Sequence, residues 1–218
     1  MRPMFVALVL CLAGCGKKQG PEASVDADAE TSTAPDATTQ TVVETSRRPA
    51  QQFVRPKSLK CGSAGADEPL AGPDCVTAEV TCGQTIVGHT KGGVNRYDTD
   101  FYNNNYCWPG TRNHNGGDER VYVFKPDKSP RFKAGEQRQR VSVHFDSPCA
   151  DLTFSSMRGQ AGSCPTSTRI CDTPNPFTRK NGRSTLNMTV DAGEVYYFLV
   201  EGADDEEGAF AITVECGT

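Results

Sequence analysis

The stretch FAITVEC, residues 210–216, alternates between apolar and polar or small side chains along its whole length. In an extended chain, Phe210, Ile212 and Val214 point to one side and the intervening residues point to the other. A period of two is typical of a β-strand that buries one face. The stretch therefore predicts a strand whose apolar side faces a core.

The same period recurs upstream, in residues 141–145 and 185–190. Residues 121–124 and 195–200 are instead apolar on both sides, which predicts central strands covered on both faces by the partner sheet or by loops. No helical period runs long enough to compete. We therefore expect an all-β fold of about eight strands, a two-sheet antiparallel β-sandwich of jelly-roll type.

Composition limits the class of protein. The chain has 218 residues, of which 36% are hydrophobic, and 23 Lys and Arg against 27 Asp and Glu give a net charge of -4. So few apolar residues exclude a membrane protein of many spans, and the excess of acids argues against a nucleic-acid partner. The length is that of one compact domain with extensions.

The first residues have the features of an export signal. Arg2 precedes a short apolar run that is too short to span a membrane. The residues Leu12-Ala13-Gly14-Cys15 resemble the lipobox of bacterial lipoproteins, in which the cysteine is acylated, with palmitate among the chains, and becomes the mature N-terminus. The resemblance implies a signal peptide over 1–14, a lipid on Cys15 and, because Gly16 follows, an outer-membrane destination.

A linker is expected to follow the lipid. Residues 15–57 are rich in Thr and acids and poor in apolar side chains, which is typical of a disordered segment. Its downstream end turns basic and includes Arg55, and this run either touches anionic lipid or glycan or is solvated. The folded domain is then expected over residues 58–218.

Cysteines predict covalent staples. Besides Cys11 in the signal and the acylated cysteine, eight remain: Cys61, Cys75, Cys82, Cys107, Cys149, Cys164, Cys171 and Cys216. An even number in an exported chain without C-x₂-C pairs indicates disulfides rather than a metal site. Of the 105 ways to pair eight cysteines, our hypothesis is Cys61 with Cys75, Cys164 with Cys171, Cys82 with Cys216, and Cys107 with Cys149.

Four segments, residues 117–124, 151–154, 192–197 and 208–214, resemble bacterial pre-peptidase C-terminal domains. The resemblance extends over roughly residues 79–216 and rests mainly on framework positions. It implies a small sandwich that aids secretion, binding or adhesion.

A ligand site is predicted between Asn95 and Trp108, where aromatic rings are interleaved with carboxylates and amides. Rings stack on sugars while carboxylates and amides pair with hydroxyls. The alternative is that these rings roof the sandwich and Cys107 pins them there. The candidate ligand-binding residues are Tyr97, Asp98, Asp100, Tyr102, Asn104, Tyr106 and Trp108.

Metal and charge patterns offer weaker candidates. Asp204, Asp205 and Glu206 supply the hard oxygens that Ca²⁺ prefers, but they match no EF-hand loop, so the alternative is a solvated hairpin tip. No other cofactor is expected. The basic region from Arg120 to Arg140 either docks an anionic polymer or deters aggregation of sheet edges.

No catalytic residue is predicted. None of the three histidines lies in an HExxH motif, no serine lies in a G-x-S-x-G motif, and the disulfides consume the thiols. We therefore expect an envelope or surface lipoprotein that binds a cell-envelope glycan or another surface protein. The alternative is a hydrolase, or a protease-associated or inhibitor domain, whose site is assembled by the fold.

Overall fold

The computed structural model describes residues 54–62, 75–107, 112–129, 132, 135–162, 164–168, 170–175 and 181–217. The expected signal peptide, the lipidated cysteine and the linker up to residue 53 lie outside the described residues. Within the described part of the chain, no helix has both the length and the apolar character that a membrane span requires.

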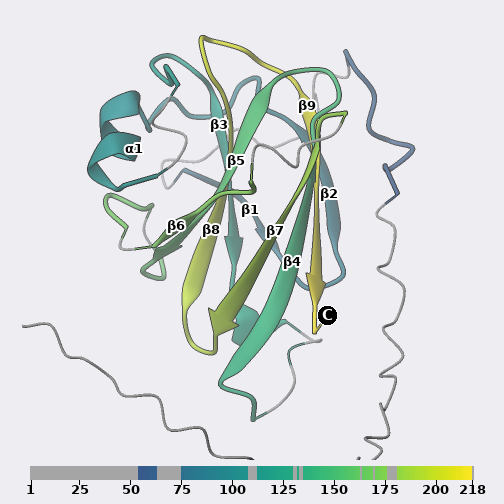
Figure 1. Ribbon diagram of the computed structural model, residues 1–218, viewed down its shortest axis with the longest axis vertical. Helices are drawn as coiled ribbons and strands as arrows, with labels where there is room; N and C mark the ends of the chain where they lie inside the picture. Colours follow the sequence, from purple (N-terminus) through teal and green to yellow (C-terminus); the bar gives the residue numbers. More distant parts are fainter. Residues whose placement is uncertain are drawn as a thin grey trace, which may run out of the picture. The chain divides into compact units, whose positions relative to one another are not determined.

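Two sheets make up the domain (Figure 1). Sheet A has the order β1 (Val76–Val80), β3 (Glu119–Phe124), β8 (Val195–Gly202), β5 (Leu152–Gly159) and β6 (Cys171–Asp172). Sheet B has the order β2 (Thr85–His89), β9 (Ala209–Cys216), β4 (Arg138–Asp146) and β7 (Arg183–Asp191). All these neighbouring strands are antiparallel except β1 and β3, which run parallel. The predicted all-β sandwich is confirmed.

The main core lies between the sheets. Phe210, Ile212 and Val214 of β9 are fully buried there, as the alternation of FAITVEC predicts. Aromatic rings join the layers: the ring of Phe145 on β4 stacks on that of Phe154 on β5, with centroids 5.4 Å apart. Each large apolar side chain buried in this way contributes about 1.5 to 3 kcal/mol of transfer free energy.

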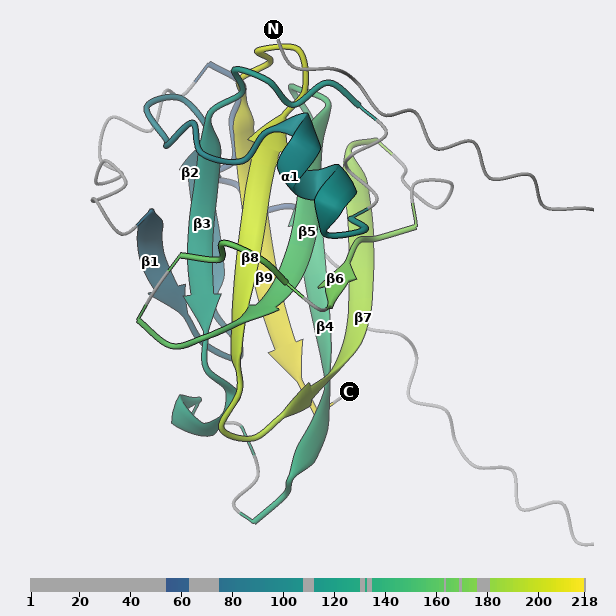
Figure 2. The same cartoon turned by 90° about the vertical axis from the view of Figure 1, so that its left-hand side faces the viewer.

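A second core covers the outer face of sheet A. The segment of residues 94–107, which we call the roof, packs over Val121, Tyr197 and Leu199, and it contains the short helix α1 (Thr99–Asn104). Figure 2 shows α1 in front of the strands of sheet A. Sheet A is therefore buried on both faces, which confirms the prediction for residues 121–124 and 195–200. A 3-10 turn, η2 (Pro126–Lys128), follows β3.

Four disulfides staple the domain, and all eight predicted cysteines take part. The predicted bond between Cys82 and Cys216 is confirmed. It joins the residues just after β1 to the end of β9. The other three predicted pairings are wrong. These cysteines lie in loops or at strand ends, where the closest partner in space is far along the chain. The observed bonds are Cys61–Cys149, Cys75–Cys164 and Cys107–Cys171.

The segment that enters the domain, Val54–Gly62, lies on one end of the outer face of sheet B. Leu59 packs on Ala209 and Ala211 of β9. Arg55 forms a two-pronged ion pair with the buried Asp146, at 2.7 Å for both contacts. Arg55, which the sequence placed in the linker, therefore contacts the sandwich.

Candidate functional site

The predicted ligand site between Asn95 and Trp108 folds as the roof. Tyr97 and Tyr102 are each 1% exposed and pack on sheet A, with the ring of Tyr97 centred 4.6 Å from that of Phe101. The two tyrosine rings are thus not ligand contacts, because they are buried against the outer face of sheet A. This corrects the prediction for both residues.

The other members of that predicted site have different positions. Asp98 caps α1, with its Oδ1 accepting from the backbone N–H of Phe101 at 2.7 Å. Asp100 and Asn104 lie exposed on α1, and Tyr106 just after it is 94% exposed. Trp108 lies outside the described residues. A ligand role for these residues stays a prediction.

Beneath the roof lies a group of buried polar side chains that the sequence did not reveal. Glu119 and Glu201 stand opposite each other on β3 and β8. Glu119 Oε1 accepts from the backbone N–H groups of Arg96, at 3.0 Å, and Tyr97, at 2.5 Å. These bonds tie the roof to the sheet, because a carboxyl group of β3 accepts from two backbone N–H groups of the chain that precedes α1.

Glu201 holds the other end of the roof. Its Oε2 accepts a short hydrogen bond from the Tyr102 hydroxyl. His114 Nδ1 lies 3.4 Å from Glu201 Oε1, and the His114 ring is centred 4.9 Å from the Tyr102 ring. We call Glu119, Glu201, Tyr102 and His114 the buried cluster; their exposed fractions are 0 to 2%.

Burial alters the protonation of the buried cluster. Loss of water around Glu119, and then the charge of Glu201, raise the pKa of Glu119 to about 8, although its backbone hydrogen bonds oppose the shift. Burial also raises the pKa of Glu201, and contacts with His114 and Tyr102 partly offset this. Glu119 is therefore mostly a neutral acid at pH 7. Carboxyl pairs of this kind serve enzymes as acid and base only where substrate reaches them, and this pair is enclosed.

An exposed polar surface lies on the outer face of sheet B. Beyond the area covered by Leu59, the outer face of β4 and β7 presents side chains that pair across the strands. His144 Nδ1 lies 2.9 Å from Thr185 Oγ1, and the Ser142 hydroxyl donates to Asn187 Oδ1 at 2.8 Å. We call this surface the polar face: Arg140, Ser142, His144, Thr185, Asn187 and Thr189.

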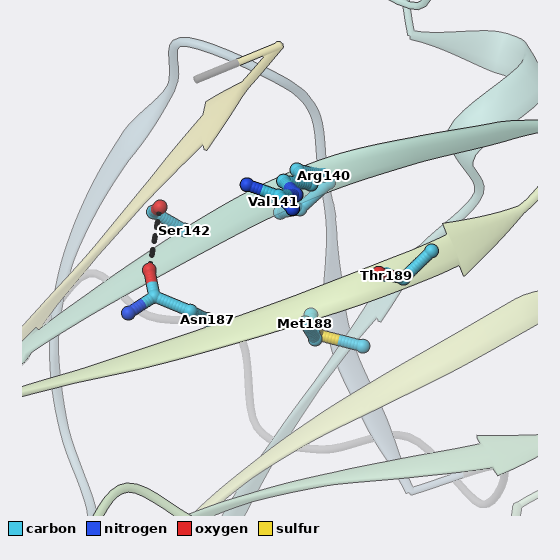
Figure 3. Close-up of a pocket in the computed structure, with 6 residues that line it drawn as sticks. All are labelled: Arg140, Val141, Ser142, Asn187, Met188 and Thr189. Atoms are coloured by element: carbon cyan, nitrogen blue, oxygen red, sulfur yellow. Dashed lines mark hydrogen bonds between the residues drawn. The ribbon is translucent and has the colours of Figure 1, made fainter. Parts of the chain in front are cut away.

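A hollow of about 350 Å³ lies on the polar face. Figure 3 shows the Ser142–Asn187 hydrogen bond at one end of it, between β4 and β7. Its lining contains one charged side chain and no carboxylate: Arg140, Val141, Ser142, Asn187, Met188 and Thr189. A volume of this size falls at the lower end of the range for ligand sites.

Three cations of the predicted basic region are held by contacts within the domain: Arg120, Lys125 and Arg138. Arg120 is buried, and it donates to the carbonyl oxygens of His89 at 2.9 Å and Lys91 at 2.7 Å. Lys125 pairs with Glu79, and Arg138 pairs with Asp191. Arg140, in contrast, is exposed and has no ion pair or side-chain hydrogen bond among the described residues.

The predicted calcium residues lie at the turn between β8 and β9. Asp204 and Asp205 are exposed, and Glu206 Oε1 accepts from the backbone N–H of Asp151 at 3.0 Å. In the part of the chain that the structure describes, no three His, Cys, Asp or Glu residues are arranged to hold a metal ion. The calcium prediction gains no support from this geometry.

No protein-family model matches the chain, and no curated protein sequence is similar to it. Among solved structures, the chain is similar to the pre-peptidase C-terminal domain of a collagenase from Bacillus anthracis. The two share 13% sequence identity with a TM-score of 0.38, over 64% of this chain and 96% of that one.

Proposed function

We propose that this chain is an exported lipoprotein, anchored in the bacterial outer membrane through acylated Cys15, whose sandwich is a non-catalytic binding module. Its ligand belongs to the cell envelope or a neighbouring surface and docks on the polar face. The observation that carries the proposal is the donor-lined hollow on β4 and β7, which lies on exposed sheet and is backed by a rigid core.

Export is supported by the cysteines. Four disulfides persist only in an oxidising compartment, outside the bacterial cytosol. The lipobox residues 12–15 supply the route and the anchor. A domain held in this way meets its ligand at the periplasmic face of the membrane or at the cell surface.

The alternative function is a hydrolase, and its best case lies on the polar face itself. His144 contacts Thr185 Oγ1 at 2.9 Å through Nδ1, and its Nε2 lies 3.3 Å from Glu215 Oε2. A hydroxyl, an imidazole and a carboxylate are thus in series. Acyl transfer also needs donors for an oxyanion, commonly backbone N–H groups. Thr185 lies on β7, and its side chain is exposed on the outer face of sheet B. The backbone N–H groups of a strand lie in the plane of its sheet, so they do not point at an acyl group bound above Thr185, and binding is the better supported function.

A retention assay tests the proposal. The full-length protein, extracted in detergent and immobilised, is incubated with solubilised envelope of its host, and retained glycans and proteins are analysed. The wild type is expected to retain a ligand, and the double variant N187A/T189A is expected to lose it. Because both side chains are exposed, matched thermal unfolding of the two proteins checks that the fold is kept. Equal retention by the two proteins would show that the ligand does not bind on the polar face. If the wild type retained nothing, the proposed binding function would be refuted.

The hydrolase and the anchor are tested separately. Hydrolysis of activated esters that His144→Ala abolishes would favour the enzyme. Radiolabelled palmitate is expected in the wild type and not in Cys15→Ser, and an intact mass equal to the unprocessed chain would disprove lipidation.

A further inference from the structure

We infer that the hollow on the polar face binds the acidic groups of an anionic glycan. This inference rests on the proposed binding function and names the class of ligand. The inference depends on the hydrogen-bond donors of the lining that have no partner among the described residues.

Arg140 supplies an uncompensated positive charge. Several other arginines of the domain have carboxylate partners: Arg138 pairs with Asp191, and Arg55 pairs with Asp146. Arg140 has no such partner within the described ranges, although it lies two residues from Arg138 on the same side of β4. A guanidinium offers five N–H donors in a planar fork that fits carboxylate, sulfate or phosphate oxygens.

The neutral groups beside Arg140 also donate. Because the Ser142 hydroxyl occupies Asn187 Oδ1, the amide of Asn187 has its N–H₂ group left for a ligand. The hydroxyl of Thr189, directly opposite Arg140 in the register of β4 and β7, has no partner within the described part of the chain. With no carboxylate in the lining, the hollow presents an excess of donors and one positive charge. Such a site selects acceptor-rich anions.

The surroundings favour a glycan over a protein as the carrier of the anion. Protein interfaces depend on aromatic or large apolar anchors at their centre. The exposed large apolar residues that the structure describes are Val54, Tyr106 and Ile170, and none lies on β4 or β7. Along β7, Thr185, Asn187 and Thr189 instead repeat a polar side chain at intervals of about 7 Å. A row of hydroxyls and amides suits an extended polymer of hydroxylated rings.

Binding to polymers of defined charge tests the inference. The full-length protein in detergent is titrated with polygalacturonate, with dextran sulfate and with neutral dextran. We expect binding to at least one anionic polymer and none to neutral dextran. We expect Arg140→Met to weaken that binding by about tenfold or more, as for loss of one charge-assisted hydrogen bond.

The matched control is Arg96→Met, the same substitution on the roof side of sheet A. Arg96 is exposed, and only its backbone N–H contacts Glu119, so the change removes an equal charge without affecting the buried cluster. Affinity within twofold of the wild type is expected. Equal losses in the two variants would show non-specific attraction and overturn the inference, as would the absence of binding to every anionic polymer.

Other sources of the anion are separated in the same assay. Binding to phosphatidylglycerol vesicles that depends on Arg140, without binding to the polymers, would overturn the inference in favour of a lipid headgroup. In the envelope retention assay, a neutral glycan or a protein held equally by wild type and Arg140→Met would leave the proposed function standing and refute the anionic ligand. Retention of nothing by the wild type would refute the proposed function itself.

Discussion

Replacing Glu119 by Gln should remove a pH dependence from the stability of the domain. Glu119 has a pKa of about 8 in the folded protein, against 4.5 for a glutamate in water. The folded state therefore holds the proton more tightly than the unfolded state does. It follows that the contribution of Glu119 to the free energy of unfolding is largest below about pH 4.5 and falls as the pH rises to about 8.

The magnitude follows from the two pKa values. The difference between the two pKa values, at about 1.4 kcal/mol per pKa unit, sets an upper limit of about 5 kcal/mol. This is the free energy of unfolding that Glu119 contributes at pH 4 and no longer contributes at pH 9. A Gln side chain keeps an oxygen to accept from the N–H groups of Arg96 and Tyr97, and it has no proton to lose. We expect Glu119→Gln to match the wild type near pH 5 and to exceed it by about 2 to 4 kcal/mol near pH 8.5.

Urea denaturation followed by far-ultraviolet circular dichroism, from pH 4 to pH 9 with the disulfides oxidised, measures the effect. Glu207→Gln is the matched control, since Glu207 is exposed in the turn before β9 and lies outside the buried cluster. Its stability curve should follow that of the wild type. Parallel curves for Glu119→Gln and the wild type would show that Glu119 ionises normally, and our account of the buried cluster would then be wrong.

Other perturbations probe the staples, the entry segment and the roof. Replacing Cys82 and Cys216 by Ala opens a loop that spans 134 residues, and non-reducing urea titration should show a loss of about 4 to 5 kcal/mol. Asp146→Ala removes the shared carboxylate partner of Arg55 and Arg183, both of which are partly exposed, and should cost about 1.5 to 3 kcal/mol in the same titration. Tyr106→Ala should change the free energy of unfolding by less than about 0.5 kcal/mol, because its ring is exposed; loss of envelope retention in this variant would place a ligand contact on the roof.

The strands were predictable because their signal is local. The alternation of FAITVEC and the two-sided apolar run of residues 195–200 report directly on burial, and the structure places both as expected. Helix α1 has only six residues, which is too short for a helical period to be recognised. Asp98, which caps this helix, was instead assigned from the sequence to a sugar site, because a carboxylate also pairs with hydroxyls.

Features that depend on pairing in space were not predictable. Glu119 begins β3 and Glu201 lies near the end of β8, about 80 residues later in the sequence. Only the register of β3 with β8 brings the two carboxyl groups together. The hollow depends in the same way on the register of β4 with β7. Its polar rows were already visible as alternate residues such as Ser142 and Asn187, so pairing those two strands would have been enough to find it. Disulfide partners in loops carry no comparable signal.

The bond between Cys61 and Cys149 has a mechanical consequence. Tension that reaches the domain from its N-terminal side passes at Cys61 through a sulfur–sulfur bond to the turn between β4 and β5. It thereby bypasses β1, an edge strand that a steady pull would otherwise peel from β3. A domain tethered to a cell surface in flowing medium would thus bear its load on covalent bonds first, and reduction of that single bond would turn a load-bearing attachment into one that unzips.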